Sequence, residues 1–187
     1  MRKALILGLA LLGSAAFIAR GDIIPTLNSV TGSSPNFNWN YTANVTVDQT
    51  VNAGDFFTIY DFSSIMPTTT TQPAGWTFST ALVGPTPALV SATDNPNLWN
   101  LTWTYSGTTA IPGATALGMF TAVTSTDQLK TGQFSAEASR SGAPAGTKID
   151  NIGNVSVPVP ESTSLLPLIG ICGAALFFAP RLRRKRA

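Results

Sequence analysis

Two stretches of the chain alternate between hydrophobic and polar residues with a period of two, which is the pattern of a β-strand with one buried face. In the first, from residue 37 to residue 52, no even position is apolar. Seven of the eight odd positions are apolar or aromatic: Phe37, Trp39, Tyr41, Ala43, Val45, Val47 and Val51. A strand of this length is long, so we expect a bend or bulge near Gln49. In the second, residues 98–105, one face carries Trp99, Leu101, Trp103 and Tyr105.

Shorter β-prone segments, separated by turn signals, fill the rest of the central chain. Residues 22–35 predict a strand plus a loop, pinned to the core by Ile23 and Ile24. The Ala-Gly-Asp sequence at 53–55 predicts a turn, and 56–62 a return strand that forms a hairpin with 37–51 and is covered on both faces. Further strands are expected at 76–83, 88–92, 115–123, 134–138 and 148–157, with loops at 67–75, 94–97, 106–114 and 139–147.

These elements predict an all-β domain over residues 22–157, with about seven to nine strands and no helical period. The fold we expect is an antiparallel β-sandwich ectodomain, with a barrel as the second choice. Two helices should flank it, one in a signal peptide at residues 1–21 and one crossing the membrane within a tail at residues 158–187.

The N-terminus has the pattern of a secretory signal peptide. Arg2 and Lys3 form the basic start, and residues 4–19 are apolar apart from Ser14. Small residues near the end favour cleavage after Ala16 or after Gly21, and the pattern does not choose between them. We expect the secretory translocon and a signal peptidase as partners; the competing interpretation is an uncleaved N-terminal anchor.

The C-terminus has the pattern of a membrane span with a cytoplasmic stop. Residues 162–180 carry no charge. As a helix they would run about 28 Å, close to the roughly 30 Å of a bilayer core. A basic cluster follows, and such clusters stay on the cytoplasmic side and hold the preceding domain outside. The cluster consists of Arg181, Arg183, Arg184, Lys185 and Arg186.

The residues in front of this predicted span form a recognisable motif. Val159, Pro160, Glu161 and Ser162, followed by the uncharged segment and the basic cluster, resemble the PEP-CTERM sorting signal. The position after the glutamate departs from the family pattern, because Ser162 stands where a second proline is usual. The resemblance covers about thirty residues and does not reach the central domain.

The resemblance implies a protein exported by the general secretory route. Its tail would be processed by an exosortase-like membrane enzyme, and the family occurs in bacteria that make exopolysaccharide. The chain would then be a transient single-span intermediate in the inner membrane before it reaches the cell surface or extracellular matrix. The alternative is a permanently membrane-anchored exported domain.

The charge and the cysteine content of the chain bear on its partners and on its disulfide bonding. The formal net charge of the chain is +2, yet residues 22–161 contain three basic residues against nine acidic ones, a balance of −6. Nucleic acid is therefore not an expected partner. The one cysteine, Cys172, lies in the predicted span, so no intrachain disulfide can form.

The chain offers little for catalysis. It has no histidine, the commonest general base and metal ligand. Asp55 and Asp61 are six residues apart on one predicted strand. Their Cα atoms would lie about 20 Å apart, too far for a glycosidase pair, which needs about 5–10 Å. A Ser-Lys dyad would need Lys130 or Lys148, and neither has a supporting motif. We expect no enzyme activity and no cofactor.

Three binding possibilities remain. Residues 94–97 and 150–154 offer oxygen donors for calcium, but ordinary turn chemistry explains them better, so no metal site is predicted. The sequences at 40–42, 44–46, 100–102 and 154–156 fit the N-glycosylation pattern, and equally the polar face of a strand. Trp76, beside Gly75 at a loop end, is the one candidate for stacking on a sugar.

The sequence therefore predicts an exported, non-enzymatic β protein with a structural or matrix role. The alternative that the residues leave open is a carbohydrate-binding module for exopolysaccharide that works by aromatic stacking.

Overall fold

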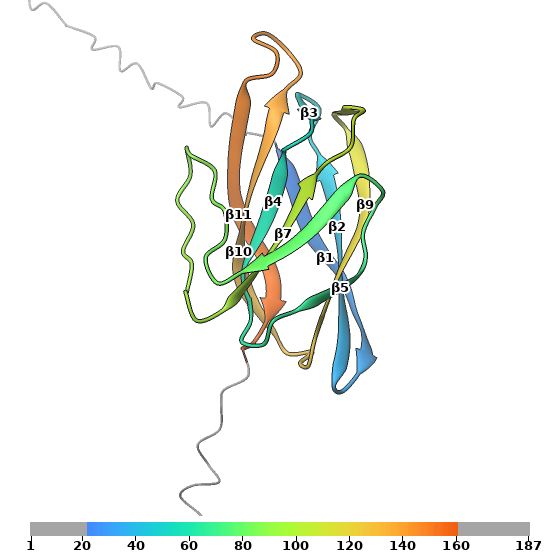
Figure 1. Ribbon diagram of the computed structural model, residues 1–187, viewed down its shortest axis with the longest axis vertical. Coiled ribbons are helices and arrows are strands. Elements are labelled where there is room, and N and C mark those ends of the chain that lie inside the picture. Colours follow the sequence, from blue (N-terminus) through green and yellow to red (C-terminus); the bar gives the residue numbers. More distant parts are fainter. Residues whose placement is uncertain (1–21, 161–187) are drawn as a thin grey trace, which may run out of the picture.

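The computed structural model describes residues 22–160, which contain strands and no helix. No helix in this range could therefore cross a membrane. The strands run in the order β1 Ile23–Ser33, β2 Asn36–Val45, β3 Gln49–Val51, β4 Phe56–Ser63, β5 Thr68–Thr71, β6 Trp76–Ala81, β7 Trp99–Tyr105, β8 Ile111–Pro112, β9 Thr115–Thr124, β10 Leu129–Arg140 and β11 Lys148–Pro158 (Figure 1).

These strands form two antiparallel sheets. The smaller has the order β1-β2-β9-β5, and the larger has the order β6-β7-β4-β10-β3-β8, with β11 paired to β10. Strands β1 and β2 form a hairpin in which Ile23 lies opposite Val45 and Ser33 opposite Asn36. Gly32, near the end of β1, has a φ of 103°, a region that side-chain-bearing residues rarely adopt.

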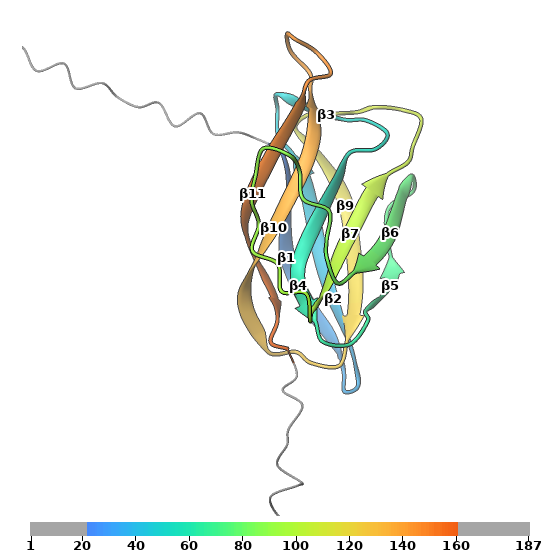
Figure 2. The ribbon, with the colours of Figure 1, turned by 60° about the vertical axis from the view of Figure 1, so that its left-hand side comes forward.

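The two sheets face one another across an aromatic core, so the arrangement is sandwich-like (Figure 2). Phe57 of β4 packs against Phe120 of β9 edge-on with ring centroids 5.0 Å apart, and stacks on Trp103 of β7 at 5.2 Å. Trp39 of β2 meets Phe62 of β4 at 5.9 Å. Rings from both sheets thus interlock, a geometry that contributes beyond the buried area alone.

The predicted alternation of β2 is confirmed, since Trp39, Tyr41, Ala43 and Val45 are all buried. The strand does not continue past Val45, however. The chain leaves the smaller sheet over residues 46–48, where Val47 is 70 % exposed, and re-enters at Gln49 in the larger sheet. The expected interruption therefore exists, but it begins earlier than Gln49, because the chain has to cross between the two layers.

The predicted hairpin between 37–51 and 56–62 is wrong. The turn at Ala53-Gly54 exists, but the two strands it joins do not pair with each other. Both run antiparallel to β10 along the same edge of that strand: Ser139 pairs with Thr50 of β3, and Glu137 with Phe56 of β4. The expectation for β4 itself is confirmed. It lies between β7 and β10, and both of its faces carry buried side chains.

Two further segments differ from expectation. The threonine run at 67–75, predicted as a loop, supplies β5, whose Thr69 pairs with Ala122 of β9. Threonine is β-branched and fits an edge strand of this kind. Residues 88–92, predicted as a strand, belong instead to a long connection between β6 and β7 that side-chain hydrogen bonds hold in place.

The flanking helices predicted for the signal peptide and for the membrane span fall in residues 1–21 and 161–187. Both ranges lie outside the described residues. Glu161, Ser162 and the basic cluster of Arg181, Arg183, Arg184, Lys185 and Arg186 belong to the second range.

Candidate functional site

Trp76, the predicted sugar contact, does not lie on the surface. Its side chain is only 4 % exposed. Its ring packs edge-on against Phe57 and Phe120, at 5.8 Å and 5.1 Å, and tilted against Tyr105 at 5.4 Å. The prediction is corrected on this point, because a ring enclosed by three others has no free face for a pyranose. Gly75 beside it suggested a loop end, but Trp76 is the first residue of β6.

The aspartates of the two segments considered as calcium ligands, residues 94–97 and 150–154, form hydrogen bonds within the protein. Asp94 accepts hydrogen bonds from the backbone of Gly84 at 2.9 Å and from the amide of Asn100 at 2.9 Å. Asp150 lies in β11 rather than in a turn and accepts one from the backbone of Leu89 at 2.7 Å. Residues 22–160 contain no group of three or more histidine, cysteine, aspartate or glutamate side chains placed to hold a metal ion.

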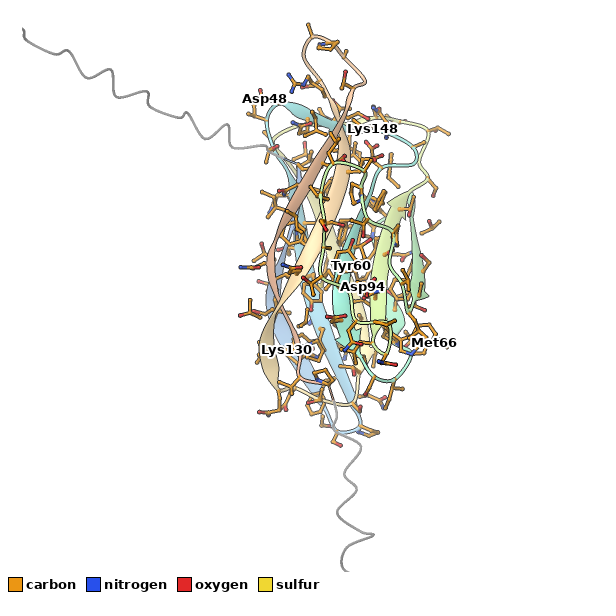
Figure 3. All side chains as sticks on the ribbon, turned by 90° about the vertical axis from the view of Figure 1, so that its left-hand side faces the viewer. Asp48, Tyr60, Met66, Asp94, Lys130 and Lys148 are labelled. Carbon is orange, nitrogen blue, oxygen red and sulfur yellow. The ribbon has the colours of Figure 1, made fainter. Side chains whose placement is uncertain are left out.

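These contacts fix the connection between β6 and β7 to the face of the larger sheet. Figure 3 shows Tyr60 and Asp94 near one another in this region. The Tyr60 hydroxyl lies 2.6 Å from the hydroxyl of Ser135 and donates to the carbonyl of Pro85 at 2.9 Å. Burial raises the pKa of Tyr60, partly offset by its hydrogen bonds to Ser135 and Thr86. These hydrogen bonds clamp the connection to β4 and β10.

Of the predicted sorting motif, Val159 and Pro160 lie within the described residues. Strand β11 ends at Pro158. The Val159 amide donates to the carbonyl of Gln128 at 2.7 Å, and its side chain is 40 % exposed. The chain thus leaves the sheet immediately before the motif, at the opposite end of the molecule from the start of β1 (Figure 1).

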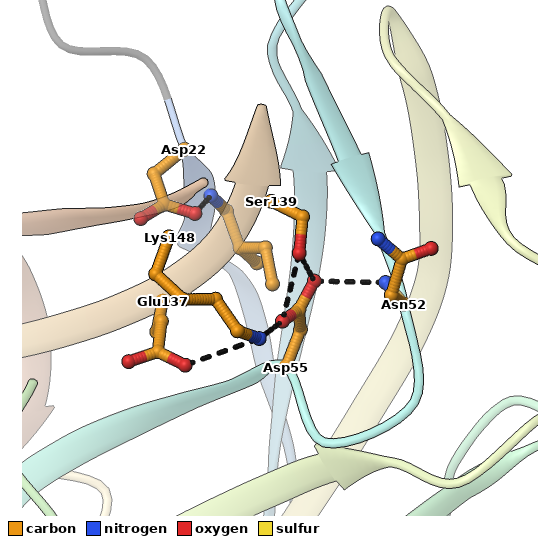
Figure 4. Close-up of polar contacts among 7 residues, drawn as sticks. Asp22, Asn52, Asp55, Glu137, Ser139 and Lys148 are labelled. Atoms are coloured by element: carbon orange, nitrogen blue, oxygen red, sulfur yellow. Dashed lines mark hydrogen bonds and ion pairs between the residues drawn. The ribbon is translucent and has the colours of Figure 1, made fainter. Parts of the chain in front are cut away.

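The most unusual group of polar side chains is one that sequence reasoning missed. Near the end of the molecule where β1 begins, Lys148 contacts Asp55 and Glu137, with Ser139 and Asp22 close by (Figure 4). The ammonium Nζ of Lys148 contacts Oδ1 of Asp55 and lies 3.2 Å from Oε1 of Glu137. We refer to Asp55, Glu137, Ser139 and Lys148 as the lysine cluster.

Asp55 is held by the turn that precedes β4. Gly54 adopts a φ of 94°, and its amide donates to the carbonyl of Tyr105 at 2.8 Å. The Tyr105 amide in turn donates to the carbonyl of Asp55 at 2.8 Å. The carboxylate of Asp55 accepts from the Asn52 amide at 2.8 Å and from the Ser139 hydroxyl at 3.2 Å. Asp55 is completely buried and has little freedom to move.

The hairpin of β10 and β11 supplies the other members. Lys148 is the first residue of β11 and pairs with Ser139. Glu137 lies two residues earlier in β10, paired with Asp150 on one side and Phe56 on the other. Because β10 runs between β4 and β11, the side chain of Asp55, the residue before β4, meets those of Glu137 and Ser139 in β10 and Lys148 in β11.

Electrostatics in this region favour the protonated form of a carboxyl group. Burial raises the pKa of Asp22 to about 8, a hydrogen bond from the Ile23 amide opposes this, and the charges of Asp55, Asp150 and Glu137 add to the rise. Oδ2 of Asp22 is buried without a hydrogen-bond partner. For Lys148, burial lowers the pKa, but the hydrogen bonds and charges of Asp55 and Glu137 outweigh burial and raise it.

Two weak signals in the sequence could have pointed to this cluster. Residues 22–160 hold only two lysines and one arginine, and Asp55 follows a glycine turn. Nothing local brings position 55 to position 148, because their contact depends on which strands pair.

Comparison with known proteins gives no match: no family model, no curated protein and no solved structure resembles this chain closely enough to be identified.

Proposed function

We propose that this chain is an exported, non-enzymatic β protein destined for the cell surface or the extracellular matrix. An exosortase-like membrane enzyme would process its tail. The observation that carries the proposal is the order of three features at the C-terminus. They are the Val159-Pro160-Glu161-Ser162 motif, an uncharged segment long enough for a membrane-spanning helix, and the basic cluster. The signal-peptide pattern at residues 1–21 supports the same route.

The described domain suits such a role. Its core is a continuous set of apolar and aromatic side chains, and its three basic residues leave no patch for nucleic acid. Within residues 22–160 the polar clusters hold strands and connections together, which favours a structural role over a catalytic one.

Carbohydrate binding by ring stacking is less well supported. Three of the four tryptophans, Trp39, Trp76 and Trp103, are buried in the core, and Trp99 is half-buried. The large hydrophobic side chains exposed within residues 22–160 are aliphatic. We therefore do not propose the carbohydrate-binding alternative as a second function.

The test is a double substitution, Pro160→Ala with Glu161→Ala, in a host that contains the matching processing enzyme. Proline holds the approach extended, and the glutamate is the one carboxylate at the outer membrane interface, so both are expected recognition features. We expect the variant to accumulate with its tail intact. The matched control is Thr163→Ala with Ser164→Ala, which changes two neighbouring polar residues and leaves the motif. Tail removal from the first variant at the normal rate would overturn the proposal.

A further inference from the structure

We propose that Lys148 and Asp55 join in an intramolecular amide bond, with Glu137 transferring the proton. The bond would link the start of β11 to the start of β4 and would form without another protein. This inference concerns the folded domain and does not depend on how the chain is exported or sorted.

The reacting groups already meet. Nζ of Lys148 contacts Oδ1 of Asp55, so the nitrogen lies beside the carboxyl carbon that it would attack. The residues are 93 positions apart, and the fold brings them together across β10, Asp55 from the turn before β4 and Lys148 from the start of β11. Groups held in such contact react as though at very high concentration, with effective molarities that reach about 10⁵ M or more.

The carboxyl group of Asp55 is prepared for attack. It is completely buried, and its neighbours fix its position. The Asn52 amide and the Ser139 hydroxyl donate hydrogen bonds to Oδ2 of Asp55, the carboxylate oxygen that Lys148 does not contact. Fixed donors at this position stabilise the negative charge that develops on that oxygen in a tetrahedral intermediate.

Glu137 occupies the position of a proton carrier. Its Oε1 lies 3.2 Å from Nζ of Lys148, within reach of the proton that the nitrogen must lose. Its side chain is 21 % exposed and that of Lys148 is 45 % exposed, so the released water has a path to solvent.

The step balances as a condensation. Asp55 and Glu137 raise the pKa of Lys148 and so favour its ammonium form, and the reaction proceeds through the minor form in which a proton has passed from Nζ to Oδ1 of Asp55. That form has a neutral amine and a neutral carboxyl group. The nitrogen lone pair forms a bond to Cγ of Asp55. Glu137 takes one proton from the nitrogen and returns it to the departing hydroxyl, the Cγ–Oδ1 bond breaks, and one water molecule leaves. No oxidant or cofactor takes part.

An amide at this position would give the domain a covalent cross-link, which it cannot obtain from a disulfide. Residues 22–160 contain no cysteine. A covalent bond between positions 55 and 148 closes a long loop and so restricts the unfolded chain, as a disulfide of similar span does.

The experiment is the intact mass, under denaturing conditions, of the purified wild-type protein and of its Lys148→Arg variant. The variant keeps the positive charge and carries the same termini, but its guanidinium is not expected to condense. We expect the wild type to be lighter than its own composition requires by one water molecule, and the variant to have its full mass. Lys130→Arg, at the other lysine of the domain, should retain the deficit.

Tryptic peptides locate the bond. An acylated Lys148 resists cleavage, so the peptide that begins at Ser141 should remain attached to the one that contains Asp55. Glu137→Gln should slow formation of this branched peptide by about 100-fold or more. A full mass for the wild type overturns the proposal, and so does a water deficit that persists in Lys148→Arg. Cross-linking at an unchanged rate in Glu137→Gln overturns the role given to Glu137.

Discussion

Asp22 is a carboxyl group whose surroundings oppose its charge. It is completely buried, its Oδ2 has no hydrogen-bond partner, and three further acids lie near enough to repel it. Its pKa of about 8, against an ordinary 3.8, means that Asp22 is protonated in the folded protein at neutral pH. Burial is the largest cause, so the shift does not require a charge on Asp55.

This residue predicts a pH-dependent stability. The unfolded chain loses the Asp22 proton near pH 3.8, while the folded chain keeps it to about pH 8. Between these values the folded state binds more protons, so the free energy of unfolding should fall as pH rises and level off above pH 8. Urea unfolding at pH 4.5, 6.5 and 8.5 measures this slope, and Asp22→Asn should flatten it. An equal slope in the variant would contradict the assignment.

Trp76 predicts a loss of stability rather than a loss of binding. Removing its ring from among Phe57, Phe120 and Tyr105 leaves a cavity, so Trp76→Ala should lower the free energy of unfolding by about 3–5 kcal/mol. Ser79→Ala, at an exposed position of the same strand, should change it by less than about 0.5 kcal/mol. Denaturant unfolding gives both values. A Trp76→Ala protein as stable as the control would show that the ring is not packed as described.

At the level of the strands, hydrophobic periodicity predicted which side chains are buried better than it predicted which strands pair. The alternation through β2 and β7 identified Trp39, Tyr41, Leu101 and Trp103 as core residues. The same alternation ran on through Val47, where the chain crosses between sheets. A period of two records which face is buried, and says nothing of where the backbone changes layer or which strand inserts beside it.

Two valines beside the point where the chain passes from the smaller to the larger sheet give a matched pair of substitutions. Val45 is 2 % exposed at the end of β2, and Val47 is 70 % exposed two residues later. Val45→Ala should therefore cost about 2 kcal/mol of stability. Val47→Ala should cost less than about 0.5 kcal/mol. Equal costs, measured by urea unfolding, would mean that the strand continues as the sequence pattern alone suggests.

One buried side-chain amide, that of Asn100, joins several parts of the connection between β6 and β7. Asn100 accepts from the Asp61 amide at 2.8 Å, and donates to Asp94 at 2.9 Å and to the carbonyl of Leu82 at 3.3 Å. Asn100→Ala leaves these groups without their partner, so the variant should lose about 1–3 kcal/mol of stability. Hydrogen exchange should quicken across residues 82–98. Asn97→Ala, at an exposed position, is the control. Unchanged protection from hydrogen exchange in Asn100→Ala would show that the Asn100 hydrogen bonds do not hold the connection.

For the molecule as a whole, the fold class could be predicted from the sequence and the lysine cluster could not. Strand periods and turn residues are local, and they suffice to predict an all-β domain with antiparallel sheets over residues 22–160. The contact of Lys148 with Asp55 arises because β3 and β4 pair with one edge of β10 and β11 pairs with the other, an arrangement that only the whole topology determines. The tail motif is also a local pattern, and it stays a prediction because most of the tail lies outside the described residues.

The central claim is that this chain is cargo for export, trimmed at both ends. The most direct test is to recover the protein from the surface fraction of its own host and measure its intact mass together with its terminal peptides. We predict a chain that begins at Phe17 or Asp22 and lacks the basic cluster that starts at Arg181. A chain that still ends at Ala187, or one found only in the cytosol, would contradict the account.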